Sequence, residues 1–415
     1  MPGRDEIGFF RWAPTPCDCL LTISLVLLAE LFENKWATHE YSSGAPSLAP
    51  FAFHKRLRGY KPTPLVSLPG LADRFGVEKV WLKDESDRFG LPAFKILGAS
   101  WAVVRVLQAR FGLADEVHSD IDRVRDRLAE SPPIRLVAAT AGNHGRAVAW
   151  FGRLLGVDAR IYVPNGSAAA RVEAIKSEGA EVIVEGTYER AIARAQRELG
   201  SNDLLIQDTA LEGYEEIPGW IVEGYSTLFW EIDEALAARN EKGPTLVLVQ
   251  MGVGSLAHAT VAHFRRPQLD SKPVVVGVEP DEAACVLASV KSGHLAELPG
   301  EQRSIMAGLN CGRMSAISLP ILQNGMNCFV TINDQRAREA MRLLADEGIV
   351  SGETGAAGLG GLLELVSGID RNEIREKLGI DGAARILLVS TEGRTDPESY
   401  EKIIGGHNQQ RRKLV

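Results

Sequence analysis

The amino-acid sequence predicts an α/β protein with two domains, built from mostly parallel sheets flanked by helices. The chain has 415 residues, more than one ordinary hydrophobic core accommodates. From about residue 60 onward, short β-branched runs alternate with longer helical patterns, which is the order of βαβ units. The strand runs are rich in Val, Ile and Leu with little alternation, as expected where both faces of a sheet are covered.

Each expected element is justified by apolar periodicity and by flanking turn residues. The first strand, 79–83, precedes a helix over 97–112. Further strands are expected at 134–140, 159–164, 180–186, 245–250, 273–280 and 385–391, and further helices at 143–156, 167–179 and 187–200. The charged stretch 114–133 is expected to form a surface helical insertion. The stretches YEEIPGWIVEGY (214–225) and SGETGAAGLGG (351–361) interrupt the alternation and are expected to be loops near a site.

The composition excludes several classes of function. The net charge of −8 argues against nucleic acid as the main partner, because phosphate binding needs a basic face. The five cysteines are an odd and scattered set that makes no disulfide framework, so a reducing, cytoplasmic setting fits best. Cys17 and Cys19 have no second pair of ligands near them in sequence, and no metal site is expected.

The N-terminal region contains an apolar run, CLLTISLVLLAELF (19–32). Its 14 residues are short for a membrane span, which needs about 20 residues. Asp5, Glu6 and Asp18 precede the run, and no convincing cleavage site for a secretory signal follows it. An amphipathic helix, or an extension upstream of the true start, is the favoured interpretation, and no membrane association is expected.

Polar residues follow two of the predicted strands at their carboxyl ends, where open α/β sheets bind ligands. In AGNHG (141–145), Asn143 either directs its amide at a ligand or caps the helix that follows. In LLVSTEGRTD (387–396), the strand ends on two hydroxyl residues, Ser390 and Thr391. Both loops are therefore candidate parts of one binding site.

A glycine loop, QMGVGS (250–255), follows a third strand and opens a helix. Its successive N–H donors form either a cradle for a single phosphate or simply a tight turn. The loop lacks the Lys of a P-loop and the last glycine of G-x-G-x-x-G, which disfavours a nicotinamide dinucleotide. The candidate phosphate ligands are Gly252, Val253, Gly254 and Ser255.

Lys95 lies in the apolar stretch RFGLPAFKIL (88–97). A buried ammonium is costly unless it is paired, neutral or covalently used, although a lysine can also extend its charge to the surface. One lysine, one phosphate cradle, one amide and one hydroxyl together indicate pyridoxal phosphate, which a lysine binds as a Schiff base. A lysine freed from the cofactor in an apolar pocket is expected to have a lowered pKa, as a base needs.

These motifs resemble those of the tryptophan-synthase β-like (fold type II) pyridoxal-phosphate enzymes, and among them the diaminopropionate ammonia-lyases are the most similar. The matching segments run from about residue 60 to about residue 400, and they are YKPTPLVSL, KDESDRFGLPAFKILGAS, AGNHGRAVAW, QDTALEGYEEIPGWIVEGY, MGVGS, VEPDEAAC, IMAGLNCG, SGETGAAGLG and STEGRTD. RFGLPAFK and DTALEGYEEIPGW are specific to this branch.

The resemblance implies a role for each candidate. Lys95 carries the cofactor, Asn143 contacts its 3′ oxygen, and Ser390, or as second choice Thr391, faces the pyridine nitrogen. Such a hydroxyl does not hold the nitrogen protonated, which favours loss of a β leaving group. The glycine loop binds the phosphate.

Two acidic residues are further candidates. Asp208 binds or protonates the departing β-amine, or else it is a structural turn residue. Glu353 lies near the ring, or else it bonds to loop N–H groups. His144 is expected to pack or to anchor its loop rather than act as a base, and Asp396 is expected to order its loop.

The resemblance also implies a homodimer in which a small domain is inserted into a larger one. The expected N-terminal extension is 1–45, and its role is open. The large cofactor-binding domain is expected at 46–96 and 209–405, the inserted α/β domain at 97–208, and a tail at 406–415.

The implied reaction is a pyridoxal-phosphate dependent α,β-elimination that converts 2,3-diaminopropionate to pyruvate and two ammonia. Ala141 replaces an aspartate expected in this branch for D-isomer use, so activity is expected on the L-isomer and weak or absent on the D-isomer. A serine/threonine dehydratase, which commonly has a small residue at that position, and a β-replacement transferase remain alternatives. A ligand-binding homologue without activity is disfavoured, because the lysine and the phosphate loop are both present.

Overall fold

The computed structural model describes residues 30–38, 40–112, 121–140, 142–269, 271–367 and 371–412, and only the backbone for 406–412. Several positions discussed above fall outside these ranges. They are most of the apolar run 19–32, Cys17, Cys19, the first part of the charged stretch 114–133, and Ala141.

The larger sheet has seven strands in the order β1-β10-β9-β8-β11-β3-β2. The five central strands are parallel, and the two edge strands, β1 and β2, pair antiparallel with their neighbours. The strands are β1 (Leu31–Glu33), β2 (Leu65–Ser67), β3 (Lys79–Asp84), β8 (Leu246–Gln250), β9 (Val274–Pro280), β10 (Cys328–Ile332) and β11 (Arg385–Ser390). Because β1 belongs to the region 1–45, part of that region completes this sheet.

The smaller sheet has four parallel strands in the order β6-β5-β4-β7. They are β4 (Arg135–Ala139), β5 (Asp158–Val163), β6 (Glu181–Val184) and β7 (Asp203–Leu205). All four lie within the range 97–208, which we keep as the proposed inserted domain. The fold is therefore of the α/β class, with two mainly parallel sheets.

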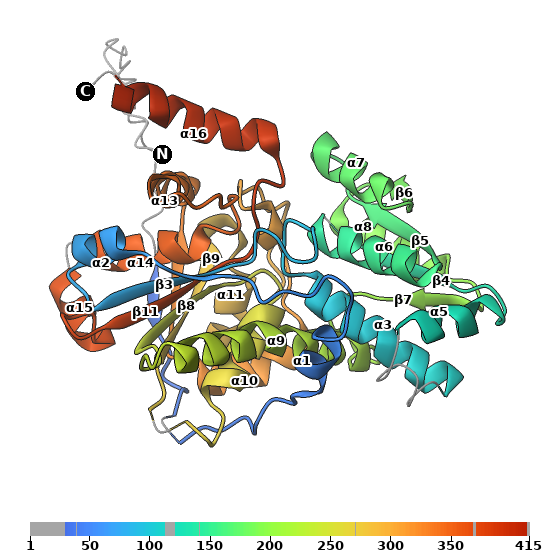
Figure 1. Cartoon of the computed structure of the whole chain (residues 1–415). Helices are drawn as coiled ribbons and strands as arrows, with labels where there is room; N and C mark the ends of the chain where they lie inside the picture. The colour runs from blue at the N-terminus through green and yellow to red at the C-terminus, as the bar shows by residue number, and fades with distance from the viewer. Residues whose placement is uncertain are drawn as a thin grey trace, which may run out of the picture.

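Helices cover both sheets, and Figure 1 shows the smaller sheet with its helices beside the larger one. They are α1 (Ala49–His54), α2 (Pro69–Phe75), α3 (Ile96–Phe111), α5 (Ile121–Ala129), α6 (Asn143–Leu155), α7 (Ala169–Ser177), α8 (Tyr188–Arg197), α9 (Glu216–Ala238), α10 (Ser255–Phe264), α11 (Cys285–Ser292), α12 (Leu319–Gly325), α13 (Asp334–Asp346), α14 (Ala357–Ser367), α15 (Arg371–Leu378) and α16 (Pro397–Arg412). None of the helices in the described ranges is long and apolar enough to cross a membrane. Helix α16 continues past residue 405, where the tail was expected to begin.

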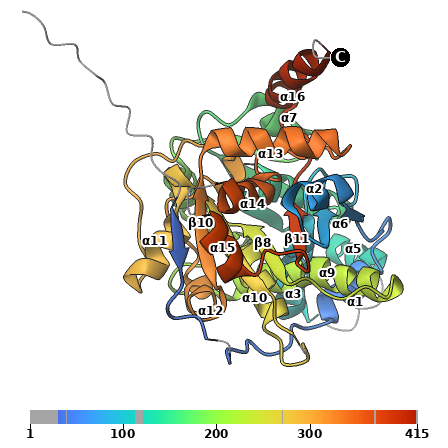
Figure 2. The same ribbon diagram turned by 90° about the vertical axis from the view of Figure 1, so that its left-hand side faces the viewer.

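The larger sheet is buried on both faces. In β8, Val247 and Val249 pack into one hydrophobic cluster, whereas Leu246 and Leu248 pack into another. This alternation is the period of two that a strand imposes on its side chains. Figure 2 shows α13 and α14 on one side of the sheet and α9, α10 and α3 on the other, which explains why these strands lack polar alternation.

The stretch 214–225 was expected to be a loop, and this expectation is wrong. Most of it forms the first turns of the 23-residue helix α9, which begins at Glu216. Pro218 lies in the first turn, where a residue without an N–H donor leaves no intrahelical hydrogen bond unmade. The stretch 214–225 therefore interrupts the alternation of strands and helices because a long helix starts there.

Candidate active site

A cavity of about 1080 Å³ is lined by loops and helix ends from both sheets. It brings together most of the residues that the sequence singled out, namely Lys95, Asn143, Asp208, Gly252, Val253, Gly254, Ser255, Glu353 and Thr391. His144 and Asp396 also line it, and of the named candidates in the described ranges only Ser390 does not. The carboxyl ends of strands in both sheets thus converge on one site.

Lys95 immediately precedes α3, and the packing of α3 against α9 brings the ring of Tyr225 close to it. Gly98 and Gly224 permit the close approach of these helices, because a Cβ on Gly224 would lie 2.4 Å from the carbonyl oxygen of Leu97. The Lys95 Nζ lies 5.8 Å from the ring centroid of Tyr225. The two glycines therefore place the Tyr225 ring beside the lysine.

The Lys95 Nζ donates a hydrogen bond to Oδ2 of Asp208 at 3.0 Å. Burial by itself would lower the pKa of Lys95, but Tyr225 and the Asp208 carboxylate outweigh it and raise that pKa above its ordinary value. Burial would likewise raise the pKa of Asp208, but the Lys95 ammonium outweighs burial, and the pKa is lowered to about 2. The expected lowering of the lysine pKa is therefore not found in the free chain, where Lys95 is a paired ammonium.

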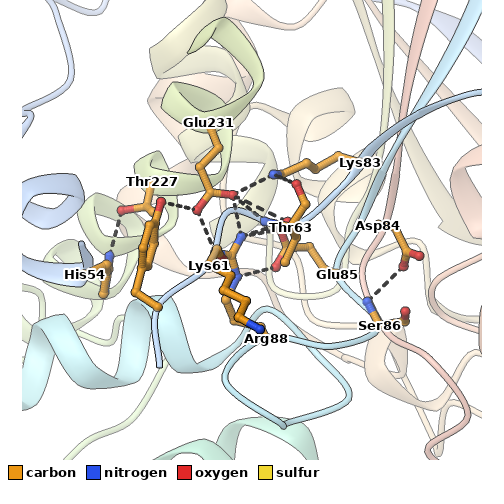
Figure 3. A network of polar contacts seen from close by, with 11 residues as sticks. His54, Lys61, Thr63, Lys83, Asp84, Glu85, Ser86, Arg88, Thr227 and Glu231 are labelled. Carbon is orange, nitrogen blue, oxygen red and sulfur yellow. Dashed lines mark hydrogen bonds and ion pairs between the residues drawn. The ribbon is translucent and has the colours of Figure 1, made fainter. Parts of the chain in front are cut away.

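A buried ionic cluster holds the segment that leads from β3 to Lys95 (Figure 3). Glu231 on α9 pairs with Lys83 and with Arg88, each at 2.6 Å, and Arg88 also pairs with Glu85 at 2.6 Å. These four side chains are at most 1% exposed. Thr63 adds a hydroxyl that donates to Glu85. Two cations and two carboxylates make the cluster neutral, as burial requires.

Asn143 and His144 begin α6. Asn143 donates through Nδ2 to Oε2 of Glu392, across the cavity from the smaller sheet to the larger one. His144 is buried, and its Nε2 lies 2.7 Å from the carbonyl oxygen of Ile206, which makes Nε2 the protonated nitrogen. Burial also lowers the pKa of His144, so the ring is neutral. His144 thus anchors the loop between β7 and Asp208.

The glycine loop ends at Gly254, which precedes α10 with φ +91°, a conformation that favours glycine. The first N–H groups of α10 have no intrahelical acceptor and carry the positive end of the helix dipole. A Cβ on Gly252 would lie 3.0 Å from the carbonyl oxygen of Gly308 and 3.2 Å from Sγ of Cys311. The glycines therefore permit a row of N–H donors on the cavity wall that suits one phosphate group.

Of the two hydroxyl candidates, Thr391 lines the cavity. Ser390 is fully buried, and its hydroxyl donates to Oγ of Ser351 at 2.7 Å. The Thr391 hydroxyl accepts a hydrogen bond from Nε2 of Gln250 at 3.0 Å. The geometry therefore favours the second choice, Thr391, as the residue facing a ring nitrogen.

The two remaining acidic candidates lie on one side of the cavity. Glu353 is buried, accepts a hydrogen bond from Ser399, and has a pKa that burial raises above its ordinary value. Asp396 accepts a hydrogen bond from the N–H of Ser399 at 3.2 Å, near the start of α16. Asp396 therefore orders its loop, and Glu353 lies against the same turn.

Sequence reasoning missed three residues of this site: Tyr225, Gln250 and Glu392. Gln250 is 2% exposed and ends an otherwise apolar strand, and a polar residue in such a run is a signal that was available. Glu392 is also 2% exposed and follows the two hydroxyl residues at the end of β11. Tyr225 offered no local signal, because its contact with Lys95 depends on the packing of two helices.

The residues fit a phosphorylated carbonyl cofactor. The same cavity is lined by a lysine ammonium, by helix N–H donors that the glycines make possible, by an amide and by a hydroxyl. The fold and this arrangement define a lysine-dependent, cofactor-using enzyme of the α/β class.

The comparisons with known proteins specify that class. A model of the pyridoxal-phosphate dependent enzyme family matches residues 57–392, and the chain belongs to this family. The chain is 40% identical over 370 residues to a diaminopropionate ammonia-lyase of Salmonella typhimurium, covering 85% of this chain and 90% of that protein. It is 38% identical over 391 residues to the Escherichia coli protein of the same name, covering 91% and 96% of the two chains.

Solved structures give the same result. The crystal structure of holo diaminopropionate ammonia lyase from Escherichia coli matches with a TM-score of 0.83 and 36% identity, over 91% of this chain and 96% of that one. A threonine deaminase of Solanum lycopersicum matches with a TM-score of 0.67 at 20% identity, over 90% and 96% of the two chains, and so shares the fold alone. The predicted α/β fold of a type II pyridoxal-phosphate enzyme is confirmed.

Proposed function

We propose that this protein eliminates ammonia from 2,3-diaminopropionate. The released 2-aminoacrylate then reacts with water to give pyruvate and a second ammonia. The observation that carries this proposal is the ion pair between Lys95 and Asp208 on the wall of the cavity. The relatives that are 38–40% identical over most of the chain are named for this reaction, which supports the same substrate here.

Each part of pyridoxal phosphate has a candidate partner in the cavity. Lys95 would hold the carbonyl carbon, the N–H groups at the start of α10 would hold the phosphate, and Asn143 would contact the ring oxygen. Thr391 would face the pyridine nitrogen. When bound, the cofactor supplies the electron sink for the electrons left at the substrate Cα.

Gln250 fixes the direction of the Thr391 hydroxyl. The Gln250 Nε2 donates to Thr391 Oγ1 and also faces the carbonyl oxygens of Thr354 and Val389, each at 3.0 Å. Because the Thr391 oxygen already accepts this hydrogen bond, its own proton is free to be donated. A donating hydroxyl suits an unprotonated pyridine nitrogen, which is the state that favours elimination.

Asp208 would exchange one cation for another during the reaction. In the free chain its carboxylate pairs with the Lys95 ammonium. A substrate with a β-ammonium group competes for the same carboxylate. Once Lys95 loses this partner, the effect of burial on its pKa is no longer offset by Asp208, and the amine becomes a better base for the Cα proton.

The charge of Asp208 also favours an amine over a hydroxyl as the leaving group. An ammonium brings the proton with which ammonia departs. A hydroxyl brings no such proton, and it brings no cation to replace Lys95 beside the buried Asp208 carboxylate. This difference argues against a serine/threonine dehydratase. We keep the L-isomer as the proposed substrate, on the basis of Ala141 in the sequence.

We also propose a homodimer that works in the cytoplasm. Both rest on the sequence: the family resemblance for the dimer, and the scattered cysteines for the reducing compartment.

A panel of substrates tests the reaction. The cofactor-loaded protein would be incubated separately with L- and D-2,3-diaminopropionate, L-serine and L-threonine, and the oxo-acid and ammonia would be measured. The proposal predicts pyruvate from the L-diamine with about two ammonia per pyruvate, and little product from the D-isomer. Product from the hydroxy amino acids alone would contradict it and identify a dehydratase.

A further inference from the structure

Glu392 is a buried carboxylate on the cavity wall that has no role in the proposed reaction. It is 2% exposed and lines the cavity. Among the described residues, no ion pair includes it, so its charge is balanced by hydrogen bonds from neutral groups. Its donors are Nδ2 of Asn143, the N–H of Thr354 at 3.2 Å and the hydroxyl of Thr395 at 3.4 Å.

The glycine-rich loop 351–356 holds the backbone of Glu392 in place. The N–H of Gly352 donates to the carbonyl oxygen of Glu392 at 3.0 Å. A Cβ on Gly355 would lie 2.5 Å from that same oxygen, and a Cβ on Gly352 would lie 3.1 Å from Oε1 of Glu392. These two glycines therefore allow the loop to pack closely against Glu392, which leaves its carboxylate little freedom to move. This packing explains why glycines occupy two positions of the SGETG motif.

The contact with Asn143 selects one orientation of its amide. An ionised carboxylate can only accept hydrogen bonds, so it must face the NH₂ group of Asn143 and not the carbonyl oxygen. The second N–H of Nδ2 then remains free to donate, and Asn143 lines the cavity. Without Glu392, the side-chain amide of Asn143 is free to rotate by 180°, which would place its carbonyl oxygen where its NH₂ group stood.

The same contact joins the two sheets across the cavity. Asn143 follows β4 of the smaller sheet, and Glu392 follows β11 of the larger sheet. The Asn143 amide is therefore held as a donor by Glu392 only when the two sheets keep this position relative to each other.

We propose that Glu392 is a positioning residue that acts through Asn143. Its carboxylate fixes the Asn143 amide as a donor toward the ring oxygen of the cofactor, and it holds the start of α6 against the end of β11. This inference rests on the proposed cofactor site, but it does not depend on which amino acid is the substrate.

A double-mutant cycle on cofactor binding tests this role. Four proteins would be stripped of cofactor: the wild type, Asn143→Ala, Glu392→Ala and the double variant. Each would be titrated with pyridoxal phosphate, and both the dissociation constant and the absorption spectrum of the lysine-bound cofactor would be recorded. We expect either single substitution to weaken binding by about tenfold and to shift the absorption, because loss of an oriented hydrogen bond to a buried group costs roughly 1–2 kcal/mol. The double variant should be no weaker than Asn143→Ala alone.

A matched control is Glu178→Ala. Glu178 is another buried carboxylate that contacts α6, through Arg146 and Arg153, but it does not line the cavity. This variant should leave the dissociation constant and the spectrum unchanged. If Glu392→Ala does not fold, Glu392→Gln keeps the volume and should change binding in the same direction by a smaller factor.

Two results would overturn the inference. One is cofactor binding by the Glu392 variants that equals the wild type. The other is a double variant whose loss equals the product of the two single losses, which would mean that Glu392 acts independently of Asn143. Either result, obtained with a wild-type protein that binds the cofactor and converts the diamine, would leave the proposed function intact.

Discussion

The Nζ of Lys95 lies 3.0 Å from Oδ2 of Asp208, although 113 residues separate them in the chain. Lys95 lies between α3 and β3, a strand of the larger sheet, whereas Asp208 follows β7 of the smaller sheet. The proposed cofactor-binding group is thus paired, in the free chain, with the carboxylate that we assign to the departing amine. The proposed reaction depends on this pair.

The pair predicts a pH dependence for the cofactor-free protein. The pKa of Asp208 is lowered to about 2 when folded, so its contribution to stability is present above pH ~4 and is lost as the pH falls toward 2. Asp208→Asn should therefore lower stability near neutral pH by on the order of 2 kcal/mol. Thermal unfolding of both proteins from pH 7 downward should show the difference in melting temperature closing below pH ~4. A constant difference across that range would contradict this account of Asp208.

The two hydroxyl candidates are separated by a pair of substitutions. Thr391→Val keeps the shape of the side chain and removes the hydroxyl that Gln250 orients, so it should shift the spectrum of the bound cofactor and reduce kcat by about tenfold. Ser390→Ala removes a hydroxyl that bonds to Ser351 away from the cavity, and it should cost only about 1 kcal/mol of stability. Absorption spectra and steady-state kinetics check both. An altered spectrum for Ser390→Ala with a normal one for Thr391→Val would reverse the assignment.

The buried ionic cluster predicts a large loss of stability when Glu231 is neutralised. Glu231→Gln leaves Lys83 and Arg88 with only Glu85 to balance them, and breaking such a buried cluster costs about 3–5 kcal/mol. Glu234→Gln, on the same helix, is the matched control because its pair with Lys55 is exposed, so it should cost less than about 1 kcal/mol. Urea unfolding measures both. Equal losses would show that the cluster contributes no more than a surface pair.

The geometry of the glycine loop predicts that Gly252→Ala weakens cofactor binding by at least about tenfold. The new methyl group would press on the carbonyl oxygen of Gly308 and displace the N–H donors of the loop. Gly219→Ala is the control, because a Cβ there meets no atom within 4 Å. It lies in α9 and should leave binding unchanged while raising stability by about 0.5–1 kcal/mol. Titration with pyridoxal phosphate decides the matter, and unchanged binding by Gly252→Ala would remove this loop from the phosphate site.

The regular elements could be predicted because their signals are local. The strand expected at 79–83 is β3 (Lys79–Asp84), and the helix expected at 143–156 is α6 (Asn143–Leu155). The three-residue strands β1, β2 and β7 were not predicted, since a strand this short has no periodicity to detect, and the five-residue strand β10 was also missed. The start of α9 was missed because the stretch 214–225 was interpreted as an interruption of the alternating strands and helices.

The site could be predicted only in part, for a related reason. Lys95, Asn143, Thr391 and the glycine loop belong to motifs with local meaning. In the cofactor-free chain Lys95 is paired with Asp208, and this pairing could not be predicted because the two residues are distant in sequence. Gln250 and Glu392 act through tertiary contacts with other site residues, and no spacing in the sequence reveals such contacts.

Chemical trapping tests most directly the central claim that Lys95 carries the cofactor. The cofactor-loaded protein would be reduced with borohydride and digested, and the modified peptide would be identified by mass spectrometry. We expect the added mass of reduced pyridoxal phosphate on Lys95, and no such adduct in Lys95→Ala. The same mass on Lys83 or another lysine, or no stable adduct in a protein that converts the diamine, would contradict it.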